Sequence, residues 1–266
     1  MHKVALTRIP ADSLDQGLRI EYRGPVDIAK AKREHRDYRE CLRRIGFEVR
    51  TLPSVLHLPD SVFVEDPAVI AEDCLVMGRL RREGRQGEEA LLEEALTPHF
   101  PRVFRIEPPG FLEGGDVLVA NGEVFVGLST RTNEIGAEQL ACVMWNALRY
   151  KTYVFPIPQS YLHLKGEATF HPRSPATPRD VITVSGEIAH HFRESNSRLL
   201  VTDPSERFGG NCISRNGLAL VHTGRAYTSN LLQNEGFAVM FADISEFEKI
   251  DGALNCLSKF FSARRG

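Results

Sequence analysis

A thiol and an imidazole in one chain can form a nucleophile and its proton-transfer partner. Cys256 and His163 are the pair that the sequence favours for these roles. The thiolate is the reactive form of cysteine, and a neighbouring imidazole can take its proton and later return one. For either residue alone a structural role is the simpler interpretation, because a free cysteine usually packs as a small hydrophobe and His163 stands between two leucines.

Acidic residues occur in two compact segments. Asp60, Glu65 and Asp66 lie in the first segment, and Glu113 and Asp116 lie in the second. Turn and capping chemistry would account for them, whereas in one pocket they would be costly without a cation. A guanidinium would satisfy more of the set, because its planar fork of donors matches carboxylates in pairs and holds its carbon within reach of a thiolate. The sequence therefore favours a cationic guanidino substrate.

The other end of such a substrate would carry a free carboxylate, which requires cations of its own. Arg131, in the segment 127–133, and Arg85, in the arginine-rich loop 79–89, are the candidates for this contact. A guanidinium fork can hold a carboxylate bidentately, although a charge-rich loop is usually only a solvated surface.

Composition limits the classes of function that remain. The 33 basic and 35 acidic residues of the 266-residue chain nearly cancel, so we expect no nucleic acid partner. No apolar run is long enough for a membrane span or a secretory signal, which predicts a cytoplasmic protein. Five widely spaced cysteines without a Cys-x-x-Cys pair indicate neither a disulfide framework nor a zinc site, and we expect no metal and no other cofactor.

The elements that must position these residues follow a period along the chain. From Glu65 to Glu113 is 48 positions, followed by 50 to His163, 48 to Asn211 and 45 to Cys256. A nearly constant period of this length predicts repeated supersecondary units, of which five would fill the chain. Strand ends that converge on one axis would bring the separated side chains together.

Each unit combines strand and helix. The segments 116–120 and 124–128 predict a hairpin around Asn121 and Gly122. Apolar spacing predicts helices over 28–45 and 137–148. The proline-rich stretch 171–178 is too short for a domain linker and predicts a loop. We therefore expect one catalytic domain over residues 1–266.

Taken together, these motifs resemble those of dimethylarginine dimethylaminohydrolases. The likeness covers most of the chain, includes residues 8–11 and 17–18, and keeps the motif order. The six main motifs are residues 59–66, 113–116, 129–133, 162–165, 211–213 and 249–258. The resemblance implies the pentein fold, an α/β propeller of five ββαβ units, which agrees with the five-unit period.

The resemblance also implies a reaction and a role for each site residue. Cys256 would attack the guanidinium carbon, His163 would protonate the departing amine and then activate water, and Glu113 would orient the imidazole. The products would be citrulline and a methylamine. The remaining contacts would be made by Asp66, Glu65 and Asp60 to the substrate nitrogens, Arg131 and Arg85 to the α-carboxylate, the Ile250 backbone to the amino end, and Leu18 on a closing loop.

Two other kinds of function stay open. Arginine deiminases and amidinotransferases use the same thiol and imidazole, but they are typically longer. A non-catalytic propeller would have no need for the intact set of Cys256, His163, Glu113 and Asp66. The segment after Lys165 departs from the family pattern, which leaves the leaving-group specificity open. Gly114 and Asn255 also depart from the pattern, but neither change removes a reacting group. The sequence also leaves open whether the chain forms a homodimer.

Overall fold

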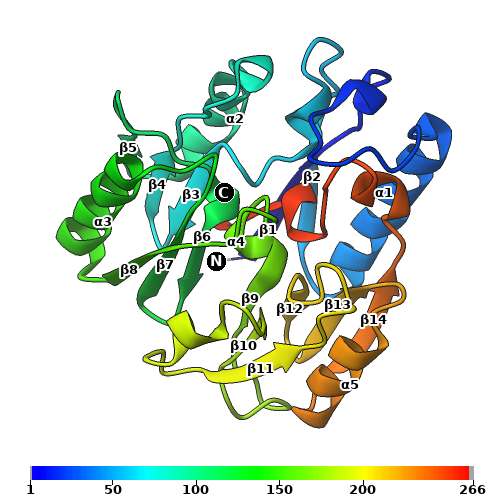
Figure 1. Ribbon diagram of the computed structural model, residues 1–266, viewed down its shortest axis with the longest axis vertical. Helices are drawn as coiled ribbons and strands as arrows, with labels where there is room; N and C mark the ends of the chain where they lie inside the picture. Colours follow the sequence, from blue (N-terminus) through cyan, green and yellow to red (C-terminus); the bar gives the residue numbers. More distant parts are fainter. Residues whose placement is uncertain (1, 264–266) are drawn as a thin grey trace.

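Five three-stranded sheets surround a common centre in the computed structural model, which describes residues 2–263 (Figure 1). In every sheet the middle strand is antiparallel to the strand next to the centre and parallel to the outer strand. The pattern repeats without exception, and it confirms the predicted α/β propeller with five units.

The strands fall into three sets by their place in each sheet. The central strands are β3 (Ala68–Ala71), β6 (Val117–Ala120), β9 (Ala168–His171), β12 (Ile213–Arg215) and β15 (Lys259–Ala263). The middle strands are β4 (Cys74–Met77), β7 (Glu123–Leu128), β10 (Val181–Ser185), β13 (Leu218–His222) and β1 (His2–Arg8). The outer strands are β5 (Arg102–Arg105), β8 (Lys151–Pro156), β11 (Arg198–Thr202), β14 (Ala238–Ala242) and β2 (Glu48–Leu52).

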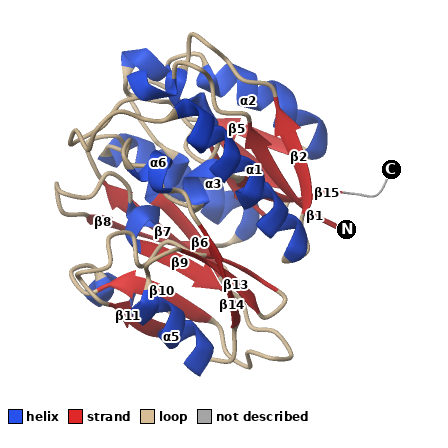
Figure 2. Cartoon of the chain, turned by 90° about the vertical axis from the view of Figure 1, so that its right-hand side faces the viewer, coloured by secondary structure: helices blue, strands red, loops and turns tan. Residues whose placement is uncertain are grey.

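Helices connect the parallel strands and lie around the outside of the sheets (Figures 1 and 2). These crossover helices are α1 (Ile28–Arg44), α2 (Glu88–Leu96), α3 (Glu134–Leu148) and α5 (Ala226–Asn234). The unit of β9, β10 and β11 differs, because the short connection between β10 and β11 forms only a 3-10 helix at Ala189–Phe192. Two further short helices are α4 (Leu164–Glu167) and α6 (Ser245–Glu248).

The two ends of the chain complete one sheet between them. β1 pairs with β15 in antiparallel register, with Val4 opposite Phe261. Apolar side chains fill the spaces between neighbouring units and form five buried clusters. Each fully buried side chain of the size of leucine contributes about 1.5–3 kcal/mol, so these clusters hold the units at fixed positions around the centre.

The local predictions agree with the structure. Asn121 and Gly122, both with positive φ, form the turn between β6 and β7. The two predicted helices correspond to α1 and α3, and the Asn133 side chain caps α3 by accepting from the Gly136 backbone N–H. His171 is the last residue of β9, and the rest of the predicted stretch, residues 172–178, is a loop.

Among the described residues, no helix is both long enough and apolar enough to span a membrane.

A short turn precedes each of four central strands and sets where the site can form. These turns are the 3-10 helices Pro59–Val62, Gly114–Asp116 and Asn255–Leu257, together with α4. Because the central strands converge, the turns meet at one end of the propeller axis. The 48-residue period is therefore the spacing between these turns.

Candidate active site

A small cavity of about 20 Å³ lies where these turns meet. Its lining comes from the N-terminal segment, from the turns before β3, β9 and β15, and from two arginine-bearing loops. The lining residues are Leu18, Asp60, Phe63, Asp66, Arg85, Arg131, Leu162, His163, Ile250, Asp251, Gly252 and Cys256. Eight of the ten residues predicted for the site are in this set. Glu113 lies behind His163, and Glu65 points elsewhere.

The His163 imidazole is held between two carboxylates. Its Nε2 lies 2.8 Å from Glu113 Oε2, and its Nδ1 lies 3.7 Å from Asp66 Oδ1. A Cβ on Gly115 would come within 2.7 Å of the imidazole Cγ, so only glycine lets the ring take this place. Burial disfavours the imidazolium, but the charges of Asp66, Asp116 and Glu113 outweigh it and raise the pKa of His163 to about 9. His163 is thus a proton donor at neutral pH.

Cys256 lies in the turn immediately before β15, and its thiol faces the cavity. Burial and then the negative charge of Asp66 raise the pKa of Cys256 to about 12, against weaker opposing effects from a hydrogen bond with the Ala253 backbone and from the charges of Lys165 and Arg85. Cys256 is therefore a neutral thiol in the empty site.

Two guanidinium groups reach the same carboxylates. Arg85 is buried, donates from Nη1 to Asp66 at 2.7 Å, and grips Glu88 through Nε at 3.1 Å and Nη2 at 2.7 Å. Arg131 donates from Nη1 to Glu113 Oε1 at 3.4 Å. Glu88 comes from the first turn of α2, so this helix fixes the position of Arg85.

Asp60 ties down the N-terminal loop (residues 17–24). Both of its carboxylate oxygens accept from the Leu18 backbone N–H, at 3.2 and 3.1 Å. Burial raises the pKa of Asp60, with the Arg85 charge opposing that effect. The Leu18 side chain is 39% exposed and also lines the cavity, so the N-terminal loop covers the site from outside.

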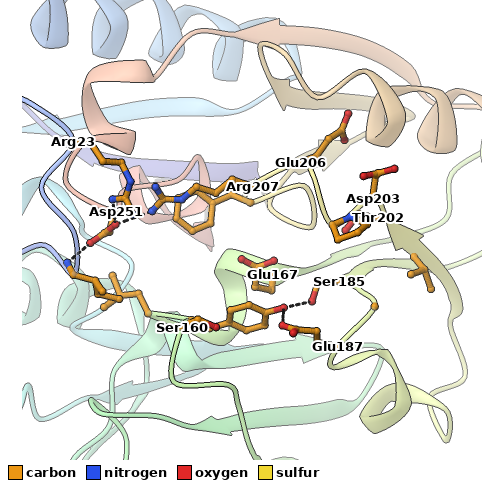
Figure 3. A pocket seen from close by; sticks show the side chains of 17 residues that line it. Arg23, Ser160, Glu167, Ser185, Glu187, Thr202, Asp203, Glu206, Arg207 and Asp251 are labelled. Carbon is orange, nitrogen blue, oxygen red and sulfur yellow. Dashed lines mark hydrogen bonds and ion pairs between the residues drawn. The ribbon is translucent and has the colours of Figure 1, made fainter.

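Asp251 holds the same loop from the opposite side. Its Oδ2 accepts from the Ile20 backbone N–H at 2.5 Å, and its Oδ1 accepts from Arg23 at 2.5 Å and from Arg207 at 2.7 Å. Figure 3 shows both arginine side chains directed at this carboxylate. The Asp251 carboxylate is buried, so these bonds act in a medium of low polarity. Asp251 therefore holds the N-terminal loop in place as a latch. The sequence patterns did not identify this residue.

Glu65 does not line the cavity. Together with Lys165 and Lys259 it forms a charged cluster beneath Cys256, here called the floor of the site. Its carboxylate pairs with Lys165 and with Lys259, whose Nζ lies 3.0 Å from Glu65 Oε1. The Glu65 backbone N–H donates to the Cys256 carbonyl at 3.3 Å. Burial lowers the pKa of Lys259 to about 7. The predicted direct contact of Glu65 with substrate therefore has no support in this geometry, because two lysines occupy the carboxylate.

Three site groups lie close enough to ligate one metal ion. Asp66, Glu113 and His163 present donor atoms within 4.8 Å of one another. Glu113 is already paired with His163, and Asp66 Oδ2 accepts from Arg85, which supplies positive charge to the cluster. Asp66 Oδ1 is buried and has no hydrogen-bond partner among the described residues. The arrangement therefore suits a cationic group placed between carboxylates and a thiol.

Sequence patterns could not identify several residues that complete the site. Glu88, Lys165, Lys259 and Asp251 are charged side chains on short or amphipathic segments, where a solvated position is the ordinary expectation. What marks these residues as part of the site is their burial, which exists only in the folded chain.

Comparison with known proteins finds relatives that act on arginine or methylated arginine by name. The arginine deiminase family model matches residues 54–171. The dimethylarginine dimethylaminohydrolase of Pseudomonas aeruginosa is 30% identical over 98% of this chain and 100% of its own length. The protein of the same name from Streptomyces coelicolor is 33% identical over 96% of each chain.

A solved structure agrees with these sequence matches. It is the Pseudomonas aeruginosa enzyme, in a cysteine-to-serine mutant in complex with citrulline, and it matches this chain with a TM-score of 0.90 at 30% identity. The match covers 98% of this chain and 100% of that one.

Proposed function

The chain belongs to the dimethylarginine dimethylaminohydrolase family of pentein hydrolases that act on guanidino groups, and from this premise we propose that it hydrolyses N-omega-methylated arginine to citrulline and a methylamine. In this proposal the whole chain, residues 1–266, acts as one catalytic domain. The site draws on segments from Leu18 to Cys256, which supports that assignment.

The observation that carries the proposal is the pairing of a neutral thiol with a protonated imidazole across a cavity lined by carboxylates. Asp66 and Asp60 are negative groups at that cavity and suit the nitrogens of a guanidinium. When the cation binds, the Cys256 proton leaves to solvent and the thiolate attacks the guanidinium carbon, forming a C–S bond.

His163 then acts as the general acid. It passes its proton to the methylated nitrogen, the C–N bond breaks with its electron pair on that nitrogen, and the amine departs. Glu113, 2.8 Å from Nε2, holds the ring during this transfer. The remaining covalent intermediate is a thiouronium on Cys256.

The neutral imidazole next acts as the base. It takes a proton from water, the hydroxide attacks the same carbon, and the C–S bond breaks to release citrulline and the thiol. Each proton transfer through His163 contributes about 10²–10⁴-fold to the rate.

The other end of the substrate meets the remaining site residues. Arg131 is better placed than Arg85 to bind an α-carboxylate. Arg131 makes one hydrogen bond of 3.4 Å to a carboxylate, whereas Arg85 already binds both Asp66 and Glu88. The Ile250 backbone would accept from the amino group, and Leu18 would cover the bound molecule. Glu65 acts from the floor and does not contact substrate.

Product analysis tests the proposal. The protein is incubated separately with arginine, monomethylarginine and asymmetric dimethylarginine, and products are identified by mass spectrometry. We expect citrulline with methylamine or dimethylamine, and none of these from Cys256→Ser. Ammonia from arginine would support a deiminase instead, and transfer of the amidino group to an added amine, leaving ornithine, would support an amidinotransferase. No product from any substrate would support a non-catalytic propeller.

A further inference from the structure

A second cavity, of about 720 Å³, extends from Asn255, in the turn before β15, to the face of the propeller opposite the active site. The central strands begin beside the catalytic turns and end at this face, where β9 reaches His171 and β12 reaches Arg215. The proline-rich loop after β9 forms part of the cavity wall through residues 172–176. This loop has no part in the active site.

The charge of the cavity lining is positive. Lys3, Arg173 and Arg215 come from three separate parts of the chain and all line the cavity. Within residues 2–263, no aspartate or glutamate lines it. Arg215 is held in place by its Nε bond to the Gly46 carbonyl at 3.0 Å. Three cations without a carboxylate among them favour a ligand with several negative charges.

The walls of the cavity are aromatic. Phe47, Phe170 and Phe260 line it, and the rings of Phe47 and Phe260 lie 4.7 Å apart between centroids. Ser214 is also among the lining residues. The Arg215 guanidinium already lies over the Phe47 ring, 5.2 Å from its centroid, so a planar base would stack on Phe170 or Phe260. The cavity volume falls within the roughly 300–1,000 Å³ of small-molecule sites.

We propose that this cavity is a regulatory binding site for a nucleoside polyphosphate. The three cations hold the phosphates, and the phenylalanine rings take the base. A bare phosphate would leave the aromatic walls unused, and a neutral nucleoside would leave the cations unused.

Asn255 connects this cavity to the nucleophile. It lines the cavity and directly precedes Cys256. Its Nδ2 donates to Thr169 Oγ1 at 3.0 Å, and its backbone N–H donates to Asn211 Oδ1 at 3.0 Å. A ligand that contacts Asn255 competes for these bonds and shifts the turn 255–257. Occupation of the cavity therefore changes the reactivity of Cys256.

Calorimetric titration of the full chain tests the binding site. The probes are ATP, pyrophosphate and adenosine, and the proteins are the wild type, the double variant Arg173→Ala/Arg215→Ala, and Arg179→Ala. Arg179 lies in the loop that follows β9 but does not line the cavity, so it controls for loss of charge.

We expect saturable binding of ATP that weakens about tenfold or more in the double variant, because charge-assisted hydrogen bonds are lost. Arg179→Ala should bind ATP with the affinity of the wild type. Pyrophosphate and adenosine, which each lack part of the nucleotide, should bind at least about tenfold more weakly than ATP. Absence of saturable ATP binding, or equal affinity in the double variant, would overturn the site. Pyrophosphate or adenosine binding as tightly as ATP would overturn the nucleotide assignment.

Alkylation of Cys256 tests the coupling, and it does not depend on which substrate the enzyme uses. The rate of its reaction with iodoacetamide is followed by peptide mass spectrometry over a series of ATP concentrations. We expect a saturable change of about twofold or more, with the same midpoint as binding and absent in the double variant. A rate that ATP leaves unchanged while it binds would overturn the regulatory role.

Discussion

Binding of a guanidinium should activate the Cys256 thiol. In the empty site burial and Asp66 raise the pKa of Cys256 to about 12. At pH 7 this corresponds to about one ionised thiol in 10⁵, compared with a few per cent for a free cysteine of pKa about 8.5. The resting enzyme should therefore resist oxidation and alkylation.

A bound cation changes this balance by a calculable amount. An opposite charge within about 4–6 Å lowers a pKa by about one to three units, so the ionised fraction of Cys256 should rise about 10- to 1,000-fold. The cation also neutralises Asp66, which is the largest charge acting against the thiolate. Asp66→Asn should for the same reason lower the resting pKa without any ligand.

The measurement is the ultraviolet absorbance of the thiolate as a function of pH. Titrations with and without acetamidine, an amidinium that cannot react, are corrected by subtracting the same titrations of Cys256→Ser. We expect a resting pKa well above 8.5 that falls when the ligand binds. A resting pKa below 7 that the ligand leaves unmoved would refute this reasoning, because it would indicate a standing ion pair of Cys256 with His163.

Three further predictions address the loop, the floor and the imidazole. Asp251→Asn removes the carboxylate that latches the N-terminal loop, so KM should rise about tenfold while kcat changes less than about threefold, as measured by citrulline formation. Glu65→Leu leaves Lys165 and Lys259 buried without a carboxylate and should destabilise the fold by about 3–5 kcal/mol in urea unfolding, whereas Lys165→Met keeps one pair and should cost less. The pKa of His163 is raised on folding from about 6.5 to about 9, so its stabilising contribution is complete below about pH 6.5 and is lost as pH rises through 9. The difference in Tm between the wild type and His163→Gln should therefore shrink between pH 7 and 10.

Each of these predictions has an outcome that contradicts it. An unchanged KM in Asp251→Asn would mean that the latch does not control substrate retention. Equal unfolding free energies for Glu65→Leu and Lys165→Met would mean that the Glu65 carboxylate does not stabilise both Lys165 and Lys259. If the Tm difference between the wild type and His163→Gln grew at alkaline pH, the pKa of His163 would be lowered on folding and not raised.

The sequence by itself determined the architecture and most of the residues that meet at the candidate site. The period of about 48 residues is a covalent property of the chain, and each repeat encodes its own hairpin and connection through local patterns such as Asn121 and Gly122. Because every repeat places its turn at the same phase, the convergence of Asp66, His163 and Cys256 followed from the repeat alone. The fourth crossover departs from the pattern, since its short segment closes with a 3-10 helix.

Only the tertiary structure decided which charges face one another. Glu65 and Asp66 are neighbours in sequence, yet Asp66 faces the cavity while Glu65 turns to the lysines of the floor. The protonation states of Cys256 and His163 depend on burial and on charges from other units. A pKa is set by the three-dimensional surroundings of a group, and local sequence patterns do not contain those distances.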